Sequence, residues 1–288
     1  MSTKNSEIGI VFHGFKKLGG EKNTEEFFMI LKKLGEKFLP SKISIDEPIK
    51  TLYSIETAKK LWIESEKDGL GGGVIFKGKT VNQLYGSVDW RNDSANSISL
   101  HISTKLLSPD SVEKVIKMAK EIFIWSNAVY GYGYHSSQRG IHYTPGISYR
   151  TCIGGITWMA IFGPPYVEMF GREVLQSAPC IVDEFSADRF MLLTSKEPRE
   201  PDQEILDIQQ KVQKHLGTDA FFRQEDKKQL FGRTFTMEEI IAGKDELSIE
   251  GYRHPDFSKH IEKSNEEQPR VIYEIKDDGS TKVTFVKP

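Results

Sequence analysis

Two histidines and two serines lie close together in the sequence and could supply a nucleophile and its general base. They are His135, Ser136, Ser137 and His142. A serine triad is assembled in space from distant segments, however, and this stretch lacks the G-x-S-x-G turn of a nucleophile elbow. His101 alternates with serines along a predicted strand, which favours a solvated surface histidine over a catalytic base. We therefore expect no catalytic residue among them.

Carboxylate pairs offer a second route to catalysis, because two carboxyl groups in different environments can divide the acid and base roles. Glu168 and Glu173 precede the pair Asp183 and Glu184. Glu168 and Glu173 are five residues apart, so on one helix they would not share a face. A carboxylate-dependent hydrolase of unknown substrate stays an alternative, and so does a structural component of a phage or secretion apparatus.

Acidic residues gather between positions 183 and 207, where eight acids stand against three bases and give a local net charge of −5. Such a segment is either a solvated edge and connector or a surface for a basic partner, since opposite charge speeds association. We include five of these acids among the candidate partner-binding residues: Asp183, Glu184, Asp188, Glu197 and Glu200.

Three tyrosines alternate with two glycines just after a predicted helix. On a strand, Tyr130, Tyr132 and Tyr134 would share one face, and Gly131 and Gly133 would leave the other face bare. The rings could pack as a cross-strand aromatic ladder, or they could form a contact surface, because tyrosine combines a large apolar area with a polar tip. We include the three tyrosines among the candidate partner-binding residues.

The elements that would position these residues follow from the hydrophobic periodicity. A period of two over residues 73–103 predicts an antiparallel meander, and residues 178–195 predict a hairpin. Apolar residues at helical spacing predict helices over 23–38, 55–65, 109–123 and 205–216. Asn23 and Glu26 would form the capping box of the first helix, which Pro40 would end. The pattern predicts an α+β fold, with antiparallel sheets and helices packed mainly on one face.

The densest apolar run, residues 153–179, predicts a sharp corner between a buried strand and a helix. Gly163 would make the bend, and proline is tolerated in the first helical turn that follows. Gly171 in mid-helix would cost about 1 kcal/mol relative to alanine, so we expect the helix to break there. We expect a structural role for seven residues of this run: Trp158, Phe162, Gly163, Pro164, Pro165, Phe170 and Gly171.

Composition narrows the class of protein. The 288 residues carry a formal net charge of −2, without the basic excess that phosphate-backbone binding needs. No run approaches the roughly 20 apolar residues of a membrane span. Cys152 and Cys180 lie among apolar residues, which favours reduced, packed thiols over a disulfide or a metal site. We expect a cytoplasmic protein with no cofactor and no direct contact with nucleic acid or membrane.

Several segments together resemble a known family. They are the run GGITWMAIFGPPYVEMFGREVLQSAP, the pair Asp183-Glu184, the strand FMLLTS, and a helix that ends in LG before Phe221. They resemble immunity proteins of bacterial polymorphic toxin systems, in particular the family called immunity protein 52. The resemblance spans about residues 70–225, and residues 231–288 lie outside it.

The resemblance implies a non-catalytic α+β domain, over residues 1–230, that binds and neutralises a cognate toxin. A nuclease of restriction-endonuclease type is one candidate toxin. Nucleases present a basic groove, and an acidic protein surface can occupy that field in place of phosphate. Residues 231–288 are predicted to form a C-terminal extension or appended subdomain that ends in a β-hairpin.

Overall fold

The computed structural model describes residues 6–14, 16–67, 69, 71–79, 83–91, 96–142, 153–221, 223–225, 228–230, 270–275 and 281–286. The chain divides into two compact units, Met1–Arg253 and His254–Pro288. The predicted boundary after residue 230 falls outside the described residues and stays a prediction. Within the described part, no helix is long and apolar enough to cross a bilayer.

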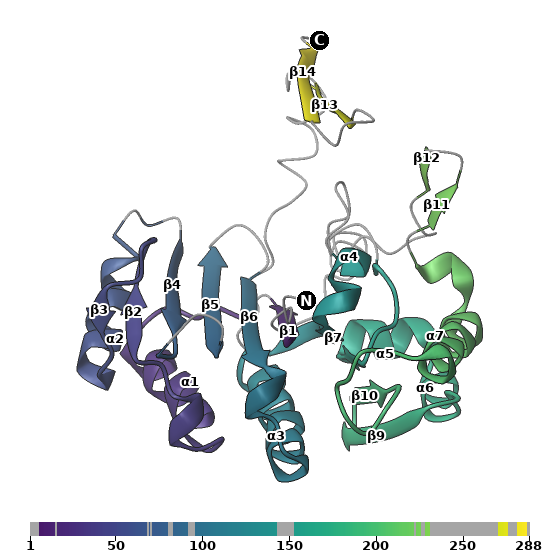
Figure 1. The fold of residues 1–288 in the computed structure, drawn as a ribbon, viewed down its shortest axis with the longest axis horizontal. Coiled ribbons are helices and arrows are strands. Elements are labelled where there is room, and N and C mark those ends of the chain that lie inside the picture. The colour runs from purple at the N-terminus through teal and green to yellow at the C-terminus, as the bar shows by residue number, and fades with distance from the viewer. Residues whose placement is uncertain are drawn as a thin grey trace, which may run out of the picture. The chain divides into compact units, whose positions relative to one another are not determined.

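A ten-stranded antiparallel sheet is the framework of the first unit (Figure 1), with strand order β3-β2-β4-β5-β6-β1-β7-β8-β10-β9. The N-terminal strand lies inside the sheet, because β1 pairs with both β6 and β7. The predicted α+β class is confirmed. The strands are β1 (Glu7–Gly14), β2 (Lys42–Ser44), β3 (Thr51–Leu52), β4 (Gly71–Lys77), β5 (Leu84–Arg91), β6 (Asn96–Ser103), β7 (Ala128–His135), β8 (Met159–Phe162), β9 (Ile181–Ser186) and β10 (Arg189–Leu193).

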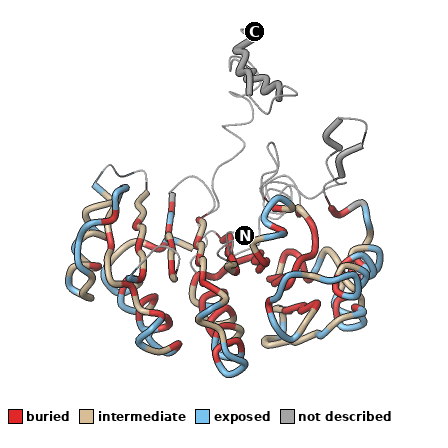
Figure 2. Tube along the Cα trace, viewed as in Figure 1, coloured by how far each residue is buried: buried red, intermediate tan, exposed pale blue. Residues whose placement is uncertain are grey.

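Three helices cover one face of this sheet: α1 (Glu21–Lys32), α2 (Ile55–Glu64) and α3 (Pro109–Trp125). On β6, Ile98, Leu100 and Ile102 are fully buried against this layer, as the alternation predicts. Leu100 lies opposite Ile10 of β1, so the apolar residues of neighbouring strands share the face. Figure 2 shows the coils of α3 alternating between buried and exposed residues, as expected for an amphipathic helix on a sheet.

Four helices belong to the second half of the sheet and lie over its opposite face. They are α4 (Arg139–His142), α5 (Pro164–Phe170), α6 (Arg172–Gln176) and α7 (Gln203–Leu216), which makes seven α-helices in the described residues. Tyr130 of β7 packs its ring 5.4 Å from that of Tyr166 on α5, and Glu184 of β9 bonds to Gln176 of α6. The predicted packing of helices on one face is therefore correct for the N-terminal half of the sheet. In the C-terminal half, a second helix layer lies on the other face.

The strand-to-helix corner forms as predicted. Gly163 caps α5, and a Cβ atom there would lie 2.8 Å from the carbonyl oxygen of Ala128, so the close approach of two backbones requires glycine. Pro164 occupies the first turn. Gly171 has φ +87°, a left-handed conformation, and it separates α5 from α6. Trp158 and Phe162 are fully buried on the strand side of the corner.

The first helix differs from its prediction at both ends. It begins at Glu21 and ends at Lys32, short of Pro40. The predicted capping box is wrong, because Asn23 lies inside the first turn and its amide donates to the carbonyl of Gly19. Gly35, with φ +110°, turns the chain after the helix. By contrast α2, α3 and α7 occupy their predicted segments, with Ser54, Ser108 and Asp202 as N-caps.

The remaining described elements are two short hairpins. One joins β11 (Arg223–Glu225) to β12 (Lys228–Leu230). The other joins β13 (Arg270–Ile275) to β14 (Thr281–Val286) in the second unit, which confirms the predicted terminal hairpin.

Candidate functional site

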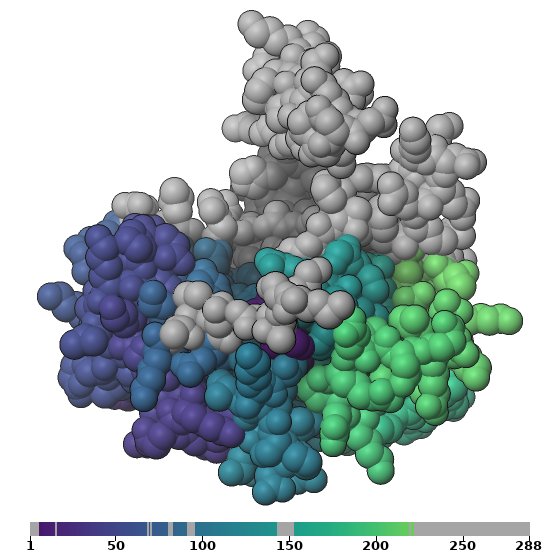
Figure 3. Space-filling view, in the orientation of Figure 1, coloured from purple at the N-terminus to yellow at the C-terminus, as the bar shows by residue number. Residues whose placement is uncertain are grey.

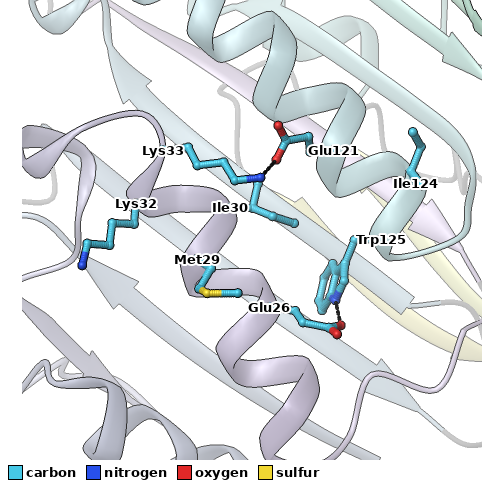
Figure 4. Close-up of a pocket in the computed structure, with 8 residues that line it drawn as sticks. All are labelled: Glu26, Met29, Ile30, Lys32, Lys33, Glu121, Ile124 and Trp125. Atoms are coloured by element: carbon cyan, nitrogen blue, oxygen red, sulfur yellow. Dashed lines mark hydrogen bonds and ion pairs between the residues drawn. The ribbon is translucent and has the colours of Figure 1, made fainter.

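An open groove lies between the outer sides of α1 and α3 (Figure 4). It has a volume of about 630 Å³. We call it the α1–α3 groove, and the residues that line it are Glu26, Met29, Ile30, Lys32, Lys33, Glu121, Ile124 and Trp125. Met29 is 60% exposed and Ile124 is 50% exposed, although both belong to helices whose other apolar residues are buried or half-buried. Exposed apolar side chains that gather beside a polar rim mark interaction surfaces.

Polar contacts hold the two walls of the α1–α3 groove in place. The indole Nε1–H of Trp125 donates to Glu26 at 3.0 Å, and Lys33 pairs with Glu121 at 2.6 Å across the two helices. Lys16 donates to the carbonyl of Trp125 at 2.7 Å and lies 5.2 Å from the centre of its ring. The groove is therefore a preformed feature of two packed helices.

The tyrosine strand is internal, which corrects the predicted contact surface. Tyr130, Tyr132 and Tyr134 are 2%, 6% and 0% exposed. Their rings form a ladder along β7, with centroids 5.6 Å and 6.1 Å apart, and α4 and α5 cover it. The three tyrosines form a packed aromatic ladder, which was the other possibility, because the helices after β7 bury the face that carries the rings.

The acidic segment does not form one patch, because neighbouring residues of a strand point to opposite faces. Asp183 pairs with Lys120 of α3 on one side of the sheet, whereas Glu184 pairs with Arg172 of α6 on the other. Asp188 accepts from Arg189 at 2.6 Å and from Ser186 at 3.1 Å. Each of these three carboxylates forms an ion pair with another side chain of the protein. The prediction that they form one acidic surface is therefore corrected.

The other five acids of the segment are exposed. Residues 196–207, which we call the acidic connector, hold five acids and two bases, and Glu197 and Glu200 are exposed there. Asp202 caps α7 through the backbone N–H of Ile205 at 3.1 Å and pairs with Arg199 at 2.7 Å. The backbone hydrogen bond holds the pKa of Asp202 below its usual range. The connector thus keeps a negative charge at the surface.

His135 lies between two serine hydroxyls, with one at each ring nitrogen. Its Nε2 is 2.6 Å from Ser6 Oγ and its Nδ1 is 2.8 Å from Ser137 Oγ. The backbone N–H of Ser137 donates to Nδ1 at 3.3 Å, which makes Nδ1 the acceptor and leaves the proton on Nε2. A protonated Nε2 cannot take the hydroxyl proton of Ser6. Burial lowers the pKa of His135, and the charge of Glu200 opposes that shift.

His142 is a packed histidine of the other sheet face. Its ring stacks on Tyr132 with centroids 4.0 Å apart, and its Nε2 lies 3.0 Å from the hydroxyl of Thr157. Thr157 donates onward to the carbonyl of Gly133 at 2.8 Å, so His142 supplies the donor to Thr157. Burial lowers the pKa of His142 to about 3, and nearby His13 adds to the shift. The imidazole is neutral and hydrogen-bonds to Thr157 rather than to Ser136 or Ser137.

His101 is more enclosed than its strand pattern predicts. Its side chain is 12% exposed, and its Nδ1 lies 3.4 Å from Glu7. The hydrogen bond from His101 lowers the pKa of Glu7. The ring also lies between Tyr85 and Tyr134, with centroids 6.1 Å and 6.4 Å away. The solvated histidine is therefore corrected to a largely enclosed residue that hydrogen-bonds to Glu7, because strand β1 brings Glu7 beside it.

The carboxylates at the corner are on separate helices. Glu168 lies on α5 and Glu173 on α6, and both are exposed on either side of the break at Gly171. Among the described side chains, no three His, Cys, Asp or Glu gather as metal ligands. Cys180 is a free thiol whose pKa burial raises to about 11. Cys152 lies outside the described residues.

The α1–α3 groove was not foreseen from the sequence, although a signal for it exists. Met29 and Ile124 are apolar residues that fall off the buried stripes of their helices. Each alone is an ordinary exposed side chain. Only the pairing of α1 with α3, through contacts such as Lys33 to Glu121, brings them to one surface.

Comparison with known proteins shows the fold and no family. No family model matches the chain, and no curated protein matches it. Among solved structures, the chain is similar to the Pseudomonas aeruginosa T6SS protein PA0821, with a TM-score of 0.54 and 8% sequence identity. The similarity covers 82% of this chain and 81% of that one. At this identity the likeness shows a shared fold.

Proposed function

We propose that this chain is a non-catalytic binding protein that neutralises a cognate bacterial toxin by direct contact. The α1–α3 groove carries the proposal, because it exposes Met29 and Ile124 between two helices whose positions are already fixed. A preformed surface of this kind binds without the entropic cost of ordering a loop. The fold likeness to a T6SS protein supports a setting in toxin and secretion systems.

The histidines make hydrogen bonds within the protein, and the two glutamates at the corner lie apart. Both observations support a role without catalysis. His135 keeps its proton on the nitrogen that faces Ser6, and His142 is neutral against Thr157. Glu168 and Glu173 stand on different helices.

A nuclease is the class of toxin that we propose. The acidic connector, residues 196–207, leaves Glu197 and Glu200 exposed, and its net negative charge would be attracted to a basic nucleic-acid groove. This electrostatic attraction would speed association, and the apolar groove would supply affinity that resists salt. Changes in the acidic connector should therefore alter how the association rate depends on salt, whereas changes in the apolar groove should lower the affinity at every salt concentration.

The experiment requires a toxin-like gene beside the gene for this chain, and the product of that gene is the probe. We expect co-production to restore growth of cells that carry the toxin, and the two proteins to co-purify at a fixed stoichiometry. If the toxin is a nuclease, the purified chain should stop cleavage of nucleic acid when added in equimolar amount. A toxin that keeps full activity in the presence of excess chain, with no complex on size exclusion, would overturn the proposal.

A further inference from the structure

We draw no further inference here: the strongest candidate, the exposed surface around Met29 on α1, which lies beside α3 (Figure 3) and between the α1–α3 groove and a second groove lined by Phe28, Leu39 and Tyr53, carries none, because nothing in the described part of the chain shows what covers it.

Discussion

At the scale of single residues, burial decides how the titratable side chains behave. His142 and Cys180 are each held in their neutral form because the packed interior disfavours charge. Sequence spacing could not reveal this, since His142 is covered through its stack on Tyr132 and its contact with Thr157. Both residues therefore report on the integrity of the packing around them.

Acid should destabilise the protein through His142. Its pKa is about 3 in the folded chain and near 6.5 in the unfolded one, so the unfolded state binds more protons between these values. Stability from this group is complete above pH 6.5 and is lost as pH falls, by about 1.4 kcal/mol per unit. Denaturant unfolding from pH 7 to 4.5 measures the loss.

The control for this prediction is a pair of variants. His142→Phe keeps a stacking ring on Tyr132 but cannot be protonated, so its stability should depend less on pH than that of the wild type. His215 is exposed on α7, and His215→Gln should keep the wild-type slope. If the free energy of unfolding falls equally steeply with pH in the wild type and in His142→Phe, the acid sensitivity does not come from His142.

Cys180 should react slowly with alkylating reagents. Burial raises the pKa of its thiol from 9.0 to about 11, which leaves about 100-fold less thiolate at neutral pH. Iodoacetamide labelling of a Cys152→Ser variant isolates the Cys180 thiol, and the rate should rise to that of a free thiol in denaturant. Rapid labelling of the folded variant would show that the Cys180 thiol is accessible to the reagent, and it would contradict the prediction.

At the scale of elements, glycine and proline residues made the strand-to-helix corner predictable. Glycine and proline act within a few residues, so the bend at Gly163, the start at Pro164 and the break at Gly171 could be read from sequence. The start of α1 was missed, because Asn23 bonds the carbonyl of Gly19 from inside the helix instead of capping it. Local signals fix an element best where the backbone permits one conformation.

The candidate site was far less predictable, because it depends on contacts between distant elements. The α1–α3 groove needs the pairing of Lys33 with Glu121, which are 88 residues apart. The burial of Tyr130 needs α5 to lie over β7. In the same way, Asp183 and Glu184 read as one charged pair in sequence, and only the sheet with its two helix layers separates them.

The corner offers a test of close packing. Gly163→Ala should lower the free energy of unfolding by about 1–3 kcal/mol, because the new methyl group would lie 2.8 Å from the carbonyl oxygen of Ala128. The control Gly140→Ala places its methyl group in open space within α4 and should change stability by less than about 0.5 kcal/mol. Chemical denaturation compares the two, and equal stabilities would contradict the close approach.

At the scale of the whole molecule, the first unit holds the complete ten-stranded sheet and both helix layers. A chain that ends at Arg253 should therefore unfold with the same midpoint and cooperativity as the full chain. Thermal and urea unfolding, followed by circular dichroism, check this. A midpoint lower by more than about 5 °C would show that residues 254–288 contribute to the stability of the first unit.

The inner position of β1 has a consequence for synthesis. This strand leaves the ribosome before its neighbours β6 and β7, and Ile8 lies opposite His135. Long-range pairing of this kind slows folding, because a large loop must close before the contact forms. The apolar β1 therefore stays unpaired until β6 and β7 have been made, and we expect ribosome-associated chaperones to bind it during that time.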